Sequence, residues 1–296
     1  MISDELLQQY KDFQNGETYC FDSKFQIIEM TGADRASFLH NFCTADIKKL
    51  ATGESSEAFV LNIKGKTLAF IQVLCLEESL AIVARASNVD ELIEHLSKYL
   101  ISEKVEIIER KDYQVAICGF QCTGALGGNA FALQLSEKAN LFVTTDAVGA
   151  SQAFASLGKK ECSPAVIEMI RVEAGYPFSD FDVSADHLAQ EFNRDATAIS
   201  YEKGCYLGQE TVARLDALGH TNRSFVQATI QQTVGDPEES PRIGDELFVD
   251  QKKVATISSM AFSPMHQCML ILATVRKPHH KPGSELLGNG YVAKVV

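Results

Sequence analysis

The pattern of hydrophobic residues changes near residue 225, and this change limits the folds open to the chain. Beyond it lie several short segments typical of β-strands, a polar turn-rich stretch at 235–246, and no helical period. This pattern predicts a small β-barrel or sandwich over 225–296. Before it, helix-like and strand-like segments follow one another, which predicts a mixed α/β region over 1–224. The 296 residues are enough for about two domains.

Capping residues mark the expected helices of the first region. Ser163 can cap a helix whose first residue is Pro164, and Gly175 is a typical stop signal. Two strands within 57–76, joined by a turn at 64–66, and others at 79–85, 105–110 and 113–120 are also expected. Further helices are expected at 31–42 with Thr31 or Asp34 as the cap, at 88–100 with Asn88 as the cap, at 149–158 and at 208–219.

Charge and hydropathy narrow the classes of function. The formal net charge is −12, which disfavours broad, salt-driven binding of nucleic acid because an acidic surface repels phosphate. The longest nearly apolar run, 68–76, is far shorter than the roughly 20 residues that span a bilayer. The N-terminal segment carries acids and has no apolar leader. We therefore expect a cytoplasmic protein without a membrane anchor.

The eight cysteines are scattered and contain no CxxC pair. In a reducing compartment most are expected to be free and buried as small apolar groups. Their spacing does not suggest a structural zinc site or a resident cluster, so no metal ligands are assigned.

One cysteine stands in an unusual context, the stretch YEKGCYLGQETVAR at 201–214. Gly204 permits a turn before Cys205, the helix expected at 208–219 follows it, and Lys203 adds positive charge. Such a setting lowers the pKa of a thiol and suits nucleophilic attack, thiol exchange or capture of a soft metal. The alternative is a cysteine buried for packing. His187 and His220 are candidate bases for this thiol, or ordinary histidines.

The segment KGCYLGQE at 203–210 resembles the signature K-G-C-[FY]-x-G-Q-E of the YgfZ family, folate-binding proteins tied to iron–sulfur proteins and tRNA modification. The segments at 32–46 and 62–70 are similar to further blocks of that family. The segment RVEAGYPFSDFDV at 171–183 resembles one shared with the aminomethyltransferase of the glycine cleavage system. The resemblance implies an α+β, GcvT-like ring of three modules. Two interleaved α/β modules occupy 1–224 and a small β-barrel occupies 225–296.

The resemblance also implies site residues. Glu173 occupies the position whose carboxylate binds the pterin ring in the related transferases, and a carboxylate can accept two N–H bonds from an aminopyrimidine edge. Cys205 is the implied catalytic group. The implied motif residues are Lys203, Gly204, Cys205, Tyr206, Gly208, Gln209 and Glu210, and the implied folate-binding residues are Glu173, Asp34, Lys64 and Arg214.

The function implied is that of a folate-binding accessory protein, with tetrahydrofolate or a derivative as cofactor, that supports iron–sulfur enzymes such as tRNA methylthiotransferase. A monomer without stable nucleic-acid or membrane binding is expected. The alternatives are a folate-dependent aminomethyltransferase and a non-enzymatic interaction module. Phe70 stands near the position where the transferases carry a catalytic aspartate, and an apolar ring cannot support an iminium-forming step. This departure disfavours the transferase.

Overall fold

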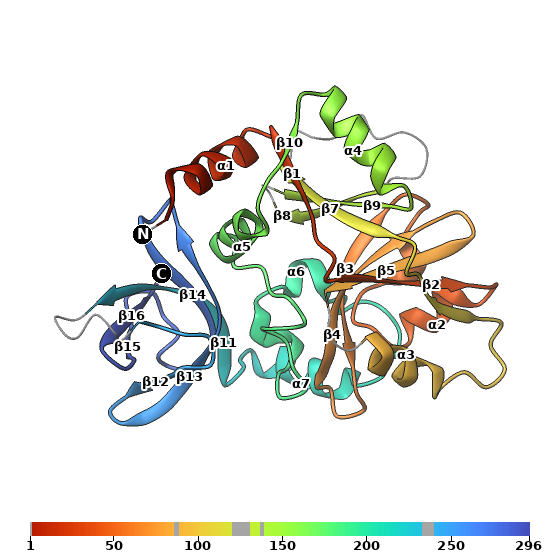
Figure 1. Cartoon of the computed structure of the whole chain (residues 1–296). Helices are drawn as coiled ribbons and strands as arrows, with labels where there is room; N and C mark the ends of the chain where they lie inside the picture. Colours follow the sequence, from red (N-terminus) through yellow and green to blue (C-terminus); the bar gives the residue numbers. More distant parts are fainter. Residues whose placement is uncertain (1, 86–88, 120–130, 137–138, 233–239) are drawn as a thin grey trace.

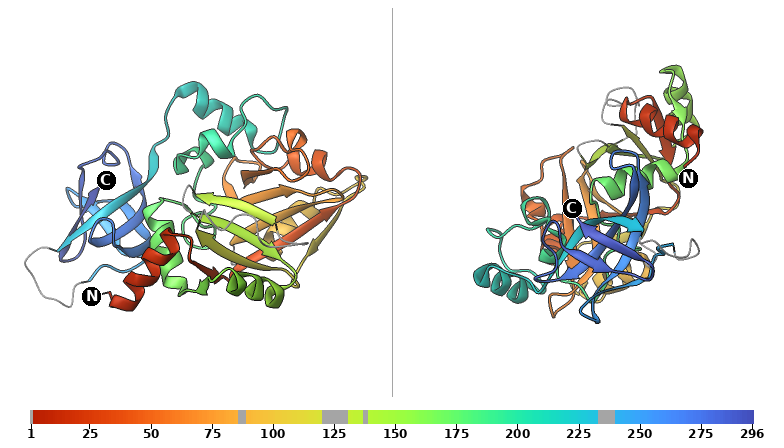
Figure 2. Two further views of the ribbon diagram at one scale, coloured as in Figure 1. Left: turned by 90° about the horizontal axis from the view of Figure 1, so that it is seen from above. Right: turned by 90° about the vertical axis from the view of Figure 1, so that its left-hand side faces the viewer.

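The computed structural model describes residues 2–85, 89–119, 131–136, 139–232 and 240–296 (Figure 1). Three units are visible: a barrel at one end, a sheet with α2 and α3 at the other, and a second sheet with α1 and α4 above. The view from above shows α1 and α5 where the second sheet approaches the barrel (Figure 2). This arrangement confirms the predicted α+β fold of three modules.

Sheet A contains strands from both ends of the α/β region. Its order is β10-β1-β7-β9-β8, with β10 parallel to β1 and the other neighbours antiparallel. Helix α4 (Ala147–Ser156) covers one face, where the Phe154 ring stacks on Tyr19. The strands are β1 (Thr18–Phe21), β7 (Gln114–Gly119), β8 (Phe131–Ser136), β9 (Ala139–Thr144) and β10 (Lys160–Glu161).

Sheet B is formed by one continuous stretch of chain between β1 and β7. It is antiparallel, in the order β3-β4-β5-β2-β6. Because β1 belongs to sheet A and the chain returns to that sheet only at β7, the predicted interleaving is confirmed. The elements are β2 (Phe25–Thr31), α2 (Arg35–His40), the 3-10 turn η1 (Ile47–Lys49), β3 (Ser55–Leu61), β4 (Thr67–Cys75), β5 (Ser79–Arg85), α3 (Val89–Ser97) and β6 (Glu106–Glu109).

The helix with the strongest sequence signals forms as predicted. The Ser163 hydroxyl accepts a hydrogen bond from the Ala165 N–H, Pro164 is the first residue of α5 (Pro164–Glu173), and Gly175 adopts φ +62° beyond its end. Asp34 precedes α2 but its carboxylate accepts from the Lys104 N–H, so it ties the helix to the end of sheet B and does not cap it. Asn88, the expected cap of α3, lies outside the described residues.

Helix α1 (Asp4–Gln14) was not expected from the sequence. Its signals are nevertheless present: the Ser3 hydroxyl accepts from the Leu6 N–H, and Leu6, Tyr10 and Phe13 share one face. The other helices are η3 (Ala189–Phe192), α6 (Asp195–Ala198) and α7 (Gln209–Leu218). Among the described residues, no helix is both long enough and apolar enough to cross a membrane.

The C-terminal strands close into a barrel, which decides between the two predicted β architectures. The order is β11-β14-β13-β12-β15-β16. The first strand begins at Arg223; the division at 224/225 stays a prediction. The strands are β11 (Arg223–Gln232), β12 (Glu246–Val249), β13 (Lys252–Ser263), β14 (Cys268–Arg276), β15 (Glu285–Leu287) and β16 (Tyr291–Val295).

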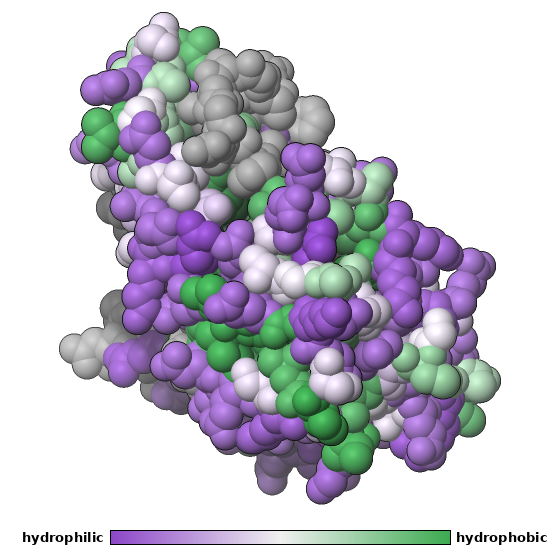
Figure 3. Space-filling view, turned by 90° about the vertical axis from the view of Figure 1, so that its right-hand side faces the viewer, coloured by the Kyte–Doolittle hydropathy of each residue, from purple (hydrophilic) through white to green (hydrophobic). Residues whose placement is uncertain are grey.

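One hydrophobic core joins the three units. It includes Phe13 of α1, Leu61 of sheet B, Leu141 of sheet A, Phe192 of η3 and Leu272 of the barrel. The units therefore bury apolar surface against one another and are not independent domains joined by a linker. On the face that carries sheet B, hydrophilic side chains surround a group of hydrophobic ones in the lower half (Figure 3).

Candidate functional site

The segment KGCYLGQE forms a loop and the first residues of α7 (Gln209–Leu218), and it is held against two other segments that the sequence singled out. The Leu207 N–H donates to the Asn41 carbonyl at 2.8 Å, which joins the loop to the segment after α2. The Thr211 hydroxyl donates to the Lys64 carbonyl at 3.0 Å, which joins the start of α7 to the turn between β3 and β4. Three stretches far apart in the sequence thus meet at one place.

Two glycines make this junction close. Gly208 and Gly65 both lie in the left-handed region, at φ +81° and +73°. A Cβ on Gly208 would stand 2.7 Å from the Asn62 carbonyl oxygen and 2.9 Å from the Gly65 Cα. Only glycine satisfies both the backbone conformation and the contact. Gly204, expected to be the turn residue, is not at positive φ, and an added Cβ would meet nothing within 4 Å.

The Lys203 side chain anchors the loop. Its buried ammonium donates to the carbonyls of His40, Cys43 and Ala45 at 2.5, 2.8 and 2.7 Å, and it lies 4.6 Å from the Tyr206 ring centroid. Burial lowers the pKa of Lys203 below its ordinary value. All three ammonium protons are used by the neighbouring backbone, so none is left to donate to the Cys205 thiol, and electrostatic assistance from this charge stays a prediction.

Cys205 is exposed, whereas the other described cysteines are buried or half-buried. The alternative of a cysteine buried for packing is therefore wrong. It lies three residues before Gly208, the N-cap of α7, so it is outside the first helical turn where the dipole acts most strongly. Gln209 and Glu210 form the start of α7, half-buried and exposed respectively. The arrangement is an exposed thiol on a firmly anchored loop.

The two candidate bases do not join the thiol in the described contacts. The His187 ring faces Ser184 and packs on Phe192. The His220 ring contacts the Leu218 carbonyl, beyond the far end of α7. No described hydrogen bond connects either ring with Cys205.

The four residues implied for folate binding occupy separate places. Lys64 is exposed in the turn beside α7, and Arg214 is exposed on α7 itself. Asp34 is engaged with the Lys104 backbone before α2. Glu173 ends α5, against α1 and the barrel. The structure does not gather them around one described cavity, and their folate role stays a prediction.

Glu173 binds the protein itself on both carboxylate oxygens. Its Oε1 accepts from the Ser263 hydroxyl at 2.5 Å and from the Met265 N–H at 3.2 Å, while Oε2 accepts from the Tyr10 hydroxyl at 2.6 Å. A carboxylate oxygen accepts about two hydrogen bonds. To accept two N–H hydrogen bonds from a pterin ring, each carboxylate oxygen needs a free acceptor position. Oε1 has none, so Glu173 as placed does not fit that ligand. The sequence did not predict Tyr10 and Ser263 as partners of Glu173. The one available signal was the apolar face of α1, which includes Tyr10 and indicates a packed helix.

A cavity of about 680 Å³ adjoins this cluster. Its walls come from Ile2 before α1, from Leu7 and Tyr10 of α1, and from the end of β13 and the turn after it, with Phe262 and Met265. Its volume is in the range of small-molecule sites, and Tyr10 is shared between its wall and the Glu173 cluster.

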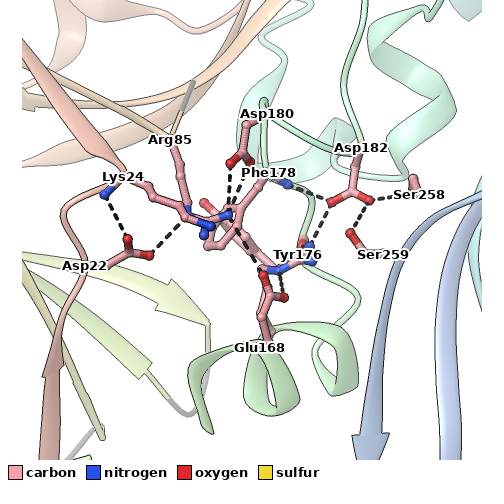
Figure 4. Close-up of polar contacts among 11 residues, drawn as sticks. Asp22, Lys24, Arg85, Glu168, Tyr176, Phe178, Asp180, Asp182, Ser258 and Ser259 are labelled. Carbon is pink, nitrogen blue, oxygen red and sulfur yellow. Dashed lines mark hydrogen bonds and ion pairs between the residues drawn. The ribbon is translucent and has the colours of Figure 1, made fainter. Parts of the chain in front are cut away.

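The segment RVEAGYPFSDFDV forms a buried polar hub between the three units (Figure 4). The Arg171 guanidinium donates to the Asp182 carboxylate at 2.7 Å, and Asp182 in turn accepts from Ser258 and Ser259 of the barrel at 2.5 and 2.8 Å. The Arg171 and Asp182 side chains are 1% and 0% exposed. A pair so fully desolvated depends on its complete set of partners.

A second arginine extends the hub to both sheets. Arg85, at the end of β5, pairs with Asp22 between β1 and β2 and with Asp180, each at 3.1 Å. The Phe178 ring receives both guanidiniums, with Arg85 at 4.6 Å and Arg171 at 4.7 Å from its centroid. Burial raises the pKa of Asp180 although Arg85 opposes this shift. The hub thus fixes the relative placement of the modules.

Phe70 is part of the core and not of a polar site. Its side chain is 4% exposed and lies beside Phe59 and Tyr176, with ring centroids 4.9 and 5.5 Å away. The Arg194 guanidinium covers the ring but is engaged with Glu57 at 2.6 Å. The apolar Phe70 side chain cannot supply the charge of the aspartate expected at this position in a transferase.

The fold defines an architectural class: a ring of three modules with the fold of an aminomethyltransferase. The chain is similar to the solved glycine cleavage system aminomethyltransferase T from Bartonella henselae, with a TM-score of 0.81 and 17% identity. The match covers 98% of this chain and 88% of that chain. At this identity it establishes the fold.

The sequence is similar to proteins named tRNA-modifying protein YgfZ. Those of Yersinia enterocolitica serotype O:8 and Yersinia pseudotuberculosis serotype O:1b are each 29% identical over 242 residues, covering 75% of this chain and 72% of the relative. These similarities confirm the predicted resemblance to the YgfZ family. No protein-family model matches the chain.

Proposed function

We propose that this protein supports tRNA modification as an accessory factor of iron–sulfur enzymes such as tRNA methylthiotransferase, with Cys205 as its reactive group. The names of its relatives support the link to tRNA modification. The single structural observation that carries the proposal is the exposure of Cys205 on an otherwise anchored loop. We further propose that it acts as a cytoplasmic monomer without stable contact to nucleic acid.

The construction of the loop supports a role for the thiol in chemistry with a partner. Lys203 and Gly208 hold the backbone on either side of Cys205 through three carbonyls and a close glycine contact. A reactive group on a rigid loop needs little reordering when a partner approaches, which lowers the entropic cost of the encounter. An exposed thiol can exchange with another thiol or bind a soft metal delivered by that partner.

Tetrahydrofolate binding is a separate part of the proposal. The aminomethyltransferase-like fold supports it. Binding through Glu173 would require the Ser263 hydroxyl to leave Oε1, because Oε1 already accepts two hydrogen bonds whereas Oε2 accepts one. Titration of the protein with tetrahydrofolate by calorimetry tests this. Ser263→Ala should tighten binding because it opens a position on Oε1, and Glu173→Gln should weaken it; equal affinities in all three proteins would exclude Glu173 from the site.

Aminomethyl transfer is less well supported. The related transferases place an aspartate where Phe70 packs into the core here, and the neighbouring Arg194 and Glu57 are bound to one another. No charged group is therefore free at this point to stabilise a developing cation. Turnover of an aminomethyl donor by the purified protein would contradict this argument.

Complementation tests the proposed function directly. Bacteria lacking their own family member would express the wild type, Cys205→Ser or the matched control Cys268→Ser at equal soluble levels. Mass spectrometry would then quantify methylthiolated adenosine in tRNA. We expect restoration by the wild type and the control, and loss with Cys205→Ser. Restoration by all three would overturn the role of Cys205, and restoration by none would overturn the proposed function.

A further inference from the structure

Two cysteines 142 positions apart lie side by side in sheet A. Strands β1 and β10 are parallel, with Thr18 opposite Lys160 and Tyr19 opposite Glu161. The next residues in this register are Cys20 and Cys162. The pairing continues to this point, because the Cys162 N–H donates to the Tyr19 carbonyl at 2.7 Å.

Both thiols project from the same face of the sheet. In-register neighbours on adjacent strands point the same way, and successive residues alternate. Cys20 and Cys162, 1% and 5% exposed, belong to the core shared by the three units, whereas Tyr19 packs with Phe154 on the opposite face. Neighbouring strands are about 5 Å apart, within the range of Cα separations that a disulfide bridges.

The two thiols differ in acidity. The proximity of the two thiols lowers the pKa of Cys162 and raises that of Cys20. Cys162 also lies just beyond β10, the edge strand of the sheet, and is the more exposed residue of the two, at 5% against 1%. Cys162 is therefore suited to attack first and Cys20 to resolve the product.

We propose that Cys20 and Cys162 form a dithiol–disulfide site that is oxidised by low-molecular-weight disulfides. The Cys162 thiolate attacks one sulfur of the oxidant, forms a mixed disulfide and releases one thiol. The Cys20 thiolate then attacks the Cys162 sulfur, closes the protein disulfide and releases the second thiol. In balance, two protein thiols and one small disulfide give one protein disulfide and two small thiols.

The bond would join β1 to the start of α5. Ser163, the cap of α5, follows Cys162 directly, and α5 carries Arg171 of the hub and Glu173 at its end. The Ser163 N–H also donates to the Gln9 side chain of α1 at 2.9 Å. Oxidation would therefore tie together the elements that converge on Glu173, whereas Cys205 lies on a different loop and takes no part.

Peptide mapping tests the site on the intact protein. The wild type would be equilibrated in buffers of oxidised and reduced glutathione, alkylated and digested with trypsin without reduction. Cys20, Cys162 and Cys205 fall in separate tryptic peptides, 12–24, 161–171 and 204–214, each with a single cysteine. We expect peptides 12–24 and 161–171 to appear as one species lighter by two hydrogens than their sum, with 204–214 outside it.

Variants and thermal unfolding complete the test. Cys20→Ser and Cys162→Ser should each abolish the linked species, and the matched control Cys205→Ser should keep it. The melting temperature of the wild type should rise by about 5 °C or more on oxidation, because the bond closes a long loop. Alkylation of Cys20 and Cys162 at every glutathione ratio in the folded wild type would overturn the proposal. So would linkage of either cysteine to Cys205 instead.

Discussion

The hub and the cysteine loop both join distant parts of the chain, but they differ in what they leave exposed. In the hub, Arg171 and Asp182 are fully buried and every interaction points inward. In the loop, Lys203 and Gly208 are held by contacts with the rest of the protein, while Cys205 between them is exposed to solvent. The hub is a structural joint. The loop is a platform on which one reactive group is presented.

The difference shows that a short motif contains residues with different tasks. Lys203 and Gly208 lie within six positions of each other and hold the loop, whereas Cys205 between them makes no described hydrogen bond. Substitutions at the holding residues should therefore lower stability, and substitution of the thiol should spare stability and affect only function. We expect the loss of stability to be largest for substitutions in the hub, smaller for those that anchor the loop, and smallest for Cys205.

The largest effect is expected at the joint. Asp182→Asn removes the fully buried carboxylate paired with Arg171 and leaves only the partly exposed Glu168 as its ionic partner, which should lower the free energy of unfolding by about 3 kcal/mol. Urea unfolding followed by circular dichroism measures this. Asp186→Asn, an exposed carboxylate in the same loop, is the control and should change stability by less than about 0.5 kcal/mol. Equal stabilities of the two variants would show that the hub does not hold the modules.

A smaller loss is expected where the platform is anchored. Gly208→Ala forces a left-handed backbone and brings a Cβ within 2.7 Å of the Asn62 carbonyl oxygen. The free energy of unfolding should fall by about 2–3 kcal/mol. Gly204→Ala, four residues away in open space, should be nearly neutral in the same urea titration. A neutral Gly208→Ala would mean that the loop is loosely held.

The third prediction concerns the loss of stability at acidic pH. Burial, followed by the charge of Arg223, lowers the pKa of His187 from 6.5 to about 4. The unfolded chain therefore binds a proton between these values that the folded protein does not. Stability should be complete above pH 6.5, fall as the pH drops, and be lower by about 3 kcal/mol near pH 4.

Unfolding titrations of His187→Gln across this pH range isolate the effect. The variant should lose less stability on acidification than the wild type by that amount, whereas His220→Gln, with an exposed ring, should keep the wild-type slope. Parallel curves for His187→Gln and the wild type would refute the assignment.

The smallest change in stability is expected at the thiol itself. Cys205→Ser removes an exposed sulfur, so the free energy of unfolding should stay within about 0.5 kcal/mol of the wild type. Thermal and urea unfolding of the reduced proteins provide the check. A loss above about 2 kcal/mol would return Cys205 to a structural role and would remove the contrast between joint and platform.

Much of the fold followed from local patterns. The cap at Ser163, the proline at 164 and the positive φ of Gly175 concern neighbours a few residues apart, and α5 has the predicted limits. Alternating apolar residues located the barrel strands for the same reason. Helix α1 was missed because most of its residues are polar, and Phe13 finds its burial only against other units.

The candidate site was predictable in its residues but not in their roles. The cysteine segment was recognisable as a unit, yet nothing local distinguishes the exposed Cys205 from the buried Lys203 beside it. Glu173 was singled out as a ligand for the pterin ring, whereas its carboxylate is bound by Tyr10, 163 positions away. Such contacts depend on how whole elements pack.

By itself, the sequence determined most of the elements: where the well-capped helix α5 begins and ends, and where the apolar residues of the strands alternate. These properties depend on interactions within a few residues. Only the tertiary structure decided which side chains meet across long separations, as Arg85 meets Asp180 and Cys20 meets Cys162. The physical reason is that burial and partnership arise when separate elements exclude water together, and that outcome belongs to the packed molecule.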